Sequence, residues 1–448
     1  MSLRYRRSSS YSTLSLGRRS SINSKDVEKI QQLLAKRSKI PPQIAFSAVI
    51  LSPIAIFILA SISRLHFGSF FAFVDSDYQL EIPNLLNSSS WTIFSIVFLI
   101  QIIFICILPS DDYKIRTENG EKQIINANSF VSCLLICLFY ILGSQLGLFK
   151  GTIFFENFIE ICSIFSIFIV FLIFYIQLFI FEDDSSEQFI LDFFFGKILQ
   201  PKVFEVDIKN LVTNRLMLTF WALYSISAVY HNKNLFGKLN DSLLTLVALN
   251  LIYVARRQWT EYLPYVNLDG QNDRAGFYRL WGVGVGLLLI HTTPISVLAS
   301  AKSGFNHQIC IGIAAVNLVL QYLNTSIDLQ KYNFRAAKGK LKINDKDPFF
   351  IAAKFKTESN DSGVSLLLGS GYFSTCRHLN YTTEFLTFLT WSFLLNSDNV
   401  LAYASPLLLC LLLYGRMTKD EVRCLAKYNQ YWLQYCNKVQ YLVIPGIL

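Results

Sequence analysis

Two groups of polar residues in the C-terminal third of the chain have the composition of an anion-binding site. The segment 366–384, LLLGSGYFSTCRHLNYTTE, carries Arg377 and Asn380 and lies directly against apolar sequence. Upstream, Lys331 and Arg335 are four residues apart, so a helix would place both on one face. Such a cationic pair suits phosphate groups, although the cationic flank after a membrane span has the same composition. This pattern favours a soluble ligand bound at the membrane surface.

A second polar pattern follows in the C-terminal tail. Four polar residues recur there at every fourth position: Arg416, Asp420, Cys424 and Tyr428. This period places them on one face of a helix. Together with segment 366–384 they would form a pocket at the cytosolic mouth of a membrane domain. Taken alone, a polar stripe of this kind is more often a solvated surface or a clamp between helices than a binding site.

The elements that must position these residues are membrane helices. Apolar residues make up 52% of the 448-residue chain and charged residues only 16%, which is too little polar surface for a soluble globule of this size. A membrane span needs about 20 mainly apolar residues. Such runs lie at 43–65, 91–108, 129–149, 158–181, 214–231, 240–255, 277–300, 308–324, 385–396 and 399–415. The sequence therefore predicts an all-α integral membrane protein with about ten transmembrane helices.

The positive charge is concentrated at the N-terminus. Residues 1–40 contain ten Lys or Arg and two acids, and the whole chain has a formal net charge of +9. This Ser/Arg-rich arm lacks an apolar period, so we expect it to be disordered. The positive-inside rule predicts that it is cytosolic, and an even number of spans returns the C-terminus to the cytosol. We expect residues 41–448 to form one multi-pass membrane domain.

Two patterns that elsewhere mark metal or cofactor sites have simpler interpretations here. The nine cysteines are scattered and form no C-x-x-C pair, so we expect neither disulfides nor a metal site. The GVGVG run at 282–286 lies inside an apolar run and follows no strand. It predicts close packing between helices, not a dinucleotide-binding loop.

Four blocks of sequence, in order, resemble the sterol reductases, which reduce ring double bonds with NADPH. They are FFFGKILQP at 193–201, DRAGFY at 273–278, QKYNFR at 330–335, and segment 366–384 with the tail that follows it. The resemblance covers the C-terminal two-thirds of the chain. It implies a membrane domain of about ten helices with a cofactor pocket in the C-terminal half.

The resemblance also implies roles for individual residues. The implied NADPH contacts are Lys331, Arg335, Leu368, Phe373, Arg377, Asn380, Arg416, Asp420, Cys424, Tyr428 and Tyr435. The implied catalytic residues are His291, which stands where the family has a tyrosine proton donor, and Asp420. An imidazolium at position 291 could donate the proton, or the ring could only hydrogen-bond a neighbouring helix. The residues leave both interpretations open.

The same resemblance favours one reaction. DRAGFY and the GTIFFENF segment at 151–158 resemble the branch that reduces the 7,8 double bond of 7-dehydrocholesterol-like sterols. A carbon-14 sterol reductase is the alternative reaction, and a non-catalytic scaffold like the lamin B receptor is the alternative class. The resemblance implies the endoplasmic reticulum membrane, a sterol substrate, contact with membrane lipid and association with other sterol-pathway enzymes. No nucleic-acid partner is expected.

Overall fold

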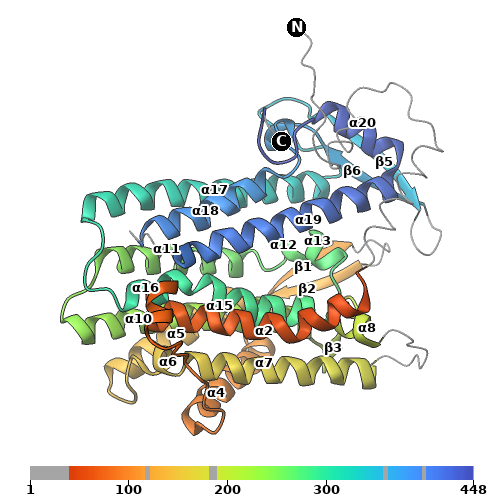
Figure 1. Cartoon of the computed structure of the whole chain (residues 1–448). Helices are drawn as coiled ribbons and strands as arrows, with labels where there is room; N and C mark the ends of the chain where they lie inside the picture. Colours follow the sequence, from red (N-terminus) through yellow and green to blue (C-terminus); the bar gives the residue numbers. More distant parts are fainter. Residues whose placement is uncertain (1–39, 117–121, 181–188, 357–361, 396–399, 447–448) are drawn as a thin grey trace.

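The computed structural model describes residues 40–116, 122–180, 189–356, 362–395 and 400–446. Apart from its last residue, the basic arm expected at 1–40 lies outside these ranges. The described chain is mostly helical, and its long helices run side by side (Figure 1). The helical part of the fold expectation is therefore confirmed.

Each apolar run predicted as a span overlaps a helix. These helices are α2 (Pro42–Leu65), α4 (Ser88–Ile107), α5 (Ser129–Gln145), α7 (Phe158–Tyr175), α10 (Met217–Phe236), α11 (Asp241–Trp259), α14 (Phe277–Trp281) with its continuation to Ala299, α17 (His307–Ala336), α18 (Leu379–Phe393) and α19 (Ala404–Tyr428). Within the described ranges, 5 helices are long and apolar enough to cross a membrane, as expected of a membrane protein. The count of about ten spans stays a prediction.

Shorter elements connect these helices. They are α3 (Phe70–Asp75), α6 (Ile153–Glu156), α8 (Phe189–Phe195), α9 (Ile208–Asn210), α12 (Leu263–Val266), α13 (Leu268–Gln271), α15 (Leu288–His291), α16 (Thr293–Ala299) and α20 (Gln430–Lys438), with π-helical turns η2 (Ile176–Ile180), η3 (Leu211–Leu216) and η4 (Gly282–Leu287) and 3₁₀ turns η5 (Gly371–Ser374) and η6 (Val400–Tyr403). Helices α17, α18 and α19 pack in sequence along one side of the bundle (Figure 1).

Three two-stranded antiparallel hairpins correct the expectation of an all-α chain. They are β1 (Asp111–Arg116) with β2 (Lys122–Ala127), β3 (Lys202–Val203) with β4 (Val206–Asp207), and β5 (Phe350–Lys356) with β6 (Ser362–Leu368). In the last hairpin Phe350 pairs with Leu368 and Lys356 with Ser362. Side chains of β5 alternate between more exposed and more buried positions, because β5 packs against α19 and α20. A helical period could not reveal these short strands.

A dense aromatic core holds the bundle together. Trp221, Trp281 and Trp391 are among its largest fully buried side chains. The GVGVG run lies in this core as the π-helical turn η4, where a Cβ added to Gly284 would stand 2.9 Å from the side chain of Val212. Close helix packing at this run, predicted from the sequence, is confirmed.

Candidate functional site

All the site residues predicted from the sequence line one cavity of about 1780 Å³. At one end, which we call the polar end, the walls are α17, β6, α20 and the second half of α19. At the other, the apolar end, the lining residues are Ala48, Ser52, Ile56, Gly282, Val283, Leu287, His291, Phe388, Leu409, Leu412 and Leu413. The cavity therefore reaches beyond the C-terminal half of the chain, into α2.

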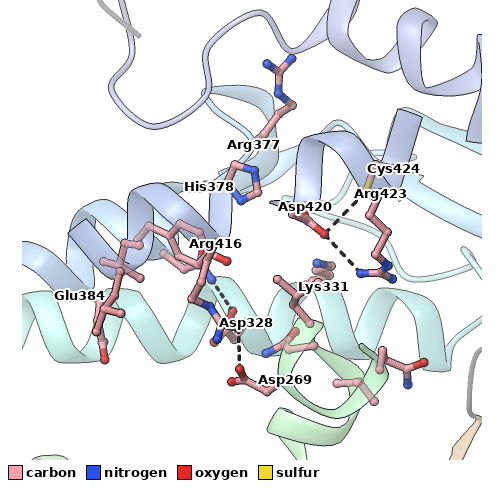
Figure 2. Close-up of a pocket in the computed structure, with 18 of the residues that line it drawn as sticks. Asp269, Asp328, Lys331, Arg377, His378, Glu384, Arg416, Asp420, Arg423 and Cys424 are labelled. Carbon is pink, nitrogen blue, oxygen red and sulfur yellow. Dashed lines mark hydrogen bonds and ion pairs between the residues drawn. The ribbon is translucent and has the colours of Figure 1, made fainter. Parts of the chain in front are cut away.

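Lys331 and Arg335 occupy the last turns of α17 and line the polar end. The Arg335 Nε donates a hydrogen bond to the main-chain oxygen of Leu366, 3.3 Å away, which joins α17 to β6. Asp420 and Asp328 lie close enough to Lys331 to interact with its charge, and Figure 2 shows all three in one part of the pocket. The two cations share one face of α17, as their spacing predicted.

The polar stripe of the tail lies on α19, which continues as a helix to Tyr428. All four of its residues line the cavity. The Asp420 Oδ1 lies 3.3 Å from Arg423 NH1 and 3.8 Å from the Cys424 Sγ (Figure 2). Helix α19 ends after Tyr428 because Asn429 takes a positive φ of 48°. The helical face predicted from the four-residue period is confirmed.

Arg416 belongs to a network of ion pairs with the loop before α14. Its guanidinium lies 2.5 Å from the Asp269 carboxylate and 3.4 Å from that of Asp273. Arg279 also pairs with Asp269, at 2.8 Å, and Lys419 with Asp273, at 2.6 Å. Burial alone would raise the pKa of Asp269, but Arg279 and Arg416 outweigh it and hold that pKa below its ordinary value. Asp269 is therefore ionised at neutral pH and anchors α19 to this loop.

Arg377 is a second cation with partners inside the protein. Its Nε lies 3.1 Å from the Glu421 carboxylate, and its NH1 donates to the main-chain oxygen of Val439 at 2.9 Å. His378 Nε2 stands 3.7 Å from the same carboxylate. Arg377 and Glu421 are both buried. In this arrangement Arg377 joins segment 366–384 to α19 and to the chain after α20.

The remaining predicted contacts build the wall around the polar end. The Tyr435 hydroxyl donates to the main-chain oxygen of Leu368 at 2.9 Å. Phe373 packs in the same buried cluster as Leu368. The Asn380 amide donates to Asp328 at 3.1 Å, which fixes the start of α18 on α17. Side chains from four separate segments thus meet around one space.

His291 is the titratable residue of the apolar end as defined above. It is buried, and its Nδ1 lies 2.9 Å from the Ser405 Oγ. Its ring packs 4.3 Å from the Phe388 ring and 5.5 Å from that of Trp221, between centroids. Gly282 faces open space, since an added Cβ would meet nothing within 4 Å. The structure therefore separates His291 from the charged cluster around Asp420.

Comparison with known proteins identifies the family. A model of the Ergosterol biosynthesis ERG4/ERG24 family matches residues 38–448. The chain belongs to this family. The resemblance described above is therefore confirmed, and it extends to nearly the whole chain.

The relatives within this family include sterol reductases of two kinds. The chain is 32% identical to a 7-dehydrocholesterol reductase of Arabidopsis thaliana over 73% of this chain and 78% of the relative. It is 24% identical to a 7-dehydrocholesterol reductase of Danio rerio, over 74% of this chain and 71% of the relative. A Delta(14)-sterol reductase of Ascobolus immersus is 27% identical to the chain, over 78% of this chain and 83% of the relative.

For this member of the family, sequence reasoning missed several lining residues. Arg257 and Asp328 line the cavity, although neither belongs to the sequence blocks or the polar stripe described above. Tyr253 also lines it, but a tyrosine within an apolar run gives no signal in the sequence. Glu384 was noted at the end of segment 366–384, but its partner Tyr253 could not be inferred. Contacts between helices, which a single sequence does not contain, reveal these residues.

Proposed function

We propose that this chain reduces a ring double bond of a sterol with NADPH, and that its substrate is a 7-dehydrocholesterol-like sterol reduced at the 7,8 position. The observation that carries the proposal is the single cavity, which joins a cation-lined end to an apolar end in a member of this family. The 32% identity to a 7-dehydrocholesterol reductase supports the 7,8 position. The volume of the cavity, about 1780 Å³, exceeds the roughly 300–1,000 Å³ of one ordinary ligand site, as two substrates require.

The polar end has the donor set that a phosphorylated dinucleotide needs. Lys331 and Arg335 are one turn apart, and the hydrogen bonds described above leave Arg335 with further guanidinium donors. Arg257 also lines the cavity and adds positive charge. We assign the 2′-phosphate and pyrophosphate of NADPH to this end, because guanidinium and ammonium groups form strong charge-assisted hydrogen bonds to phosphates. The other predicted NADPH contacts belong to the same proposal, with Arg377 and Arg416 contributing least because carboxylates of the protein already bind them.

The apolar end suits the rings of a sterol. When bound, NADPH supplies a hydride to the sterol. The protein must add a proton, and the aliphatic walls of the apolar end keep water away from the cationic sterol that protonation creates. We propose His291 as a catalytic residue that contacts the sterol at this end, and Asp420 as a catalytic residue that acts from the polar end. The two assignments rest on their places in one cavity.

Expression in yeast that lacks its own sterol reductases tests this function, with mass analysis of the accumulated sterols. We expect loss of the 7,8 double bond, whereas loss of the 14,15 double bond would assign the chain to the carbon-14 reaction. Asp420→Asn keeps the shape of the side chain and removes its charge, so conversion should fall by about 100-fold at equal protein abundance. Asp347→Asn, at an exposed position, is the matched control. Unchanged sterols with the native chain would refute the proposed function.

The cellular setting is part of the same proposal. We place the protein in the endoplasmic reticulum membrane with both termini in the cytosol, where NADPH reaches the polar end. Sterol and membrane lipid are its expected partners. Other sterol-pathway enzymes are proposed neighbours, because product and substrate of successive steps share one membrane. Fluorescence microscopy of a C-terminal fusion, combined with protease protection in isolated membranes, tests location and orientation.

A further inference from the structure

Tyr253 and Glu384 form a hydrogen-bonded pair on the wall of the cavity. Tyr253 comes from α11 and Glu384 from α18, and both line the cavity. The Tyr253 hydroxyl donates to the Glu384 Oε1 over only 2.5 Å. Tyr253 is buried, with 6% of its surface exposed. A phenol and a carboxyl group in this contact form a unit that can hold and transfer one proton.

The pair lies between the two ends of the cavity. Phe388 follows Glu384 by one helical turn and contacts both Tyr253, at 5.5 Å between ring centroids, and His291, at 4.3 Å. Trp221 also packs against both of these rings, at 5.5 Å from each. The Tyr253 and His291 rings therefore pack against the same aromatic pair.

The other oxygen of Glu384 lies beside a cation of α11. This Oε2 is buried and accepts no hydrogen bond within the described residues. The nearest cation is Arg256, whose NH2 stands 3.7 Å away. Arg256 itself donates to Asn324 and Thr325 of α17, at 2.8 and 2.9 Å. Glu384 is thus a half-buried acid whose Oε1 accepts from Tyr253 and whose Oε2 has no hydrogen-bond donor in the described part of the chain.

We propose that Tyr253 is the proton donor of the reduction and that Glu384 returns the proton to it. This inference rests on the proposed function. The sterol double bond takes the proton from the Tyr253 hydroxyl, and the carbon cation that results accepts the hydride of NADPH. Neutral Glu384 transfers its proton to the Tyr253 oxygen, and water at the polar end reprotonates Glu384. One proton from water and one hydride are consumed for each double bond reduced.

The assignment gives His291 a different task. Within the described residues its hydrogen-bonding partner is Ser405, a neutral hydroxyl that cannot offset the charge of an imidazolium. We therefore assign His291 to contact the sterol next to Tyr253, while the phenol donates the proton.

Kinetics of the purified full-length protein in lipid nanodiscs test the donor role. Tyr253→Phe should lower kcat by about 100-fold or more, while KM for NADPH and for the diene change less than about twofold. His291→Phe should retain a larger kcat than Tyr253→Phe. The matched control is Tyr322→Phe, at an exposed position of α17. Native turnover by Tyr253→Phe would overturn the assignment, whereas failure of the native protein to convert any diene would refute the proposed function instead.

Binding of an azasterol gives a second readout that needs neither NADPH nor turnover. An azasterol carries an amine in place of a ring carbon, and its ammonium form resembles the cationic sterol. Glu384→Gln should weaken azasterol binding at least tenfold and leave binding of the neutral diene unchanged, because a glutamine cannot give up the proton whose loss leaves a negative charge on the pair next to the ammonium. The control is Glu205→Gln, at an exposed position. Equal azasterol affinity in the native protein and Glu384→Gln would overturn the role of Glu384, and retained diene affinity verifies that the variant is folded.

Discussion

The polar and apolar ends of the cavity are built in opposite ways. The polar end concentrates charged residues on successive turns of α17 and α19, so one short sequence pattern supplies several of its side chains. The apolar end draws single residues from α2, η4, α15, α18 and α19. A charged surface can therefore be inferred from local spacing, whereas an apolar surface exists only after distant helices have packed.

The cations of the polar end also differ among themselves. Arg416 and Arg377 bind carboxylates of the protein at 2.5 and 3.1 Å. Arg335 instead donates to a neutral main-chain oxygen, which leaves its charge available to a ligand. A cation in a cofactor motif can thus support the architecture of the site or bind the ligand. The partners of each cation distinguish these roles.

The largest effect should come from removing both ligand-facing cations. In Lys331→Gln/Arg335→Gln, we expect KM for NADPH to rise by about 100-fold, since each hydrogen bond to a charged group contributes about 1.5–3 kcal/mol. KM for NADH should rise far less, because NADH has the pyrophosphate but lacks the 2′-phosphate. Steady-state kinetics with both cofactors measures this change. The double variant should still bind the sterol, which confines its effect to the polar end.

The control for this variant also removes two positive charges, but from residues that do not line the cavity. Lys342→Gln/Lys346→Gln removes two exposed lysines that follow α17. It should leave both KM values unchanged. If Lys331→Gln/Arg335→Gln has the native KM for NADPH, Lys331 and Arg335 are only the cationic flank of a membrane helix.

A smaller but complementary effect is expected at the apolar end. Gly282 lines the cavity and faces open space, so Gly282→Leu should place a side chain where the sterol rings bind. Sterol affinity should fall by about tenfold, because one leucine fills only part of the space. Affinity for NADPH should stay within about twofold. Direct binding of each ligand to the purified variant separates these effects.

Gly312→Leu provides a matched control for Gly282→Leu. Gly312 lies on the exposed side of α17, and an added Cβ there also meets nothing within 4 Å. Neither affinity should change in this variant. If Gly282→Leu weakens NADPH and sterol binding equally, the two ends of the cavity do not bind separate ligands.

The contrast between local spacing and packing of distant helices also explains which features of the molecule the sequence predicts. The helical face of α19 and the pairing of Lys331 with Arg335 could be predicted, because the α-helical period relates spacing to direction. The family could also be predicted, from blocks that retain their order. The β5–β6 hairpin could not, since strands of seven residues within a polar insertion leave little periodic signal.

The partners of individual side chains were equally beyond the sequence. Glu421 lies five residues after Arg416, and Asp269 lies far from it in the chain, but the structure pairs Arg416 with Asp269 and Glu421 with Arg377. Any of the nearby carboxylates could have formed these pairs. Packing of α19 against the loop before α14 decides between them, and such a choice depends on tertiary structure alone.

The smallest effect on ligand binding should come from Arg416, and it sharpens the distinction between the two kinds of cation. In Arg416→Gln, Asp269 and Asp273 lose a guanidinium partner, and removing one member of a buried ion pair typically costs about 3–5 kcal/mol. Asp269 retains Arg279 and Asp273 retains Lys419. We therefore expect a smaller loss of folding stability, measured as a lower unfolding midpoint in nanodiscs. KM for NADPH should rise less than about threefold.

Arg274→Gln is the control for this last variant, because Arg274 is exposed in the same DRAGFY block. It should change neither the unfolding midpoint nor KM. The opposite pattern for Arg416→Gln, with an unchanged midpoint and a KM raised as far as in Lys331→Gln/Arg335→Gln, would show that Arg416 leaves its carboxylates to bind the nucleotide. The ion pairs with Asp269 and Asp273 would then belong to the ligand-free state, and α19 would move relative to the loop before α14 when NADPH binds. Comparing the unfolding midpoint of Arg416→Gln with and without NADPH distinguishes the two cases. If Arg416 binds the ligand, the substitution should lower the midpoint only when NADPH is present.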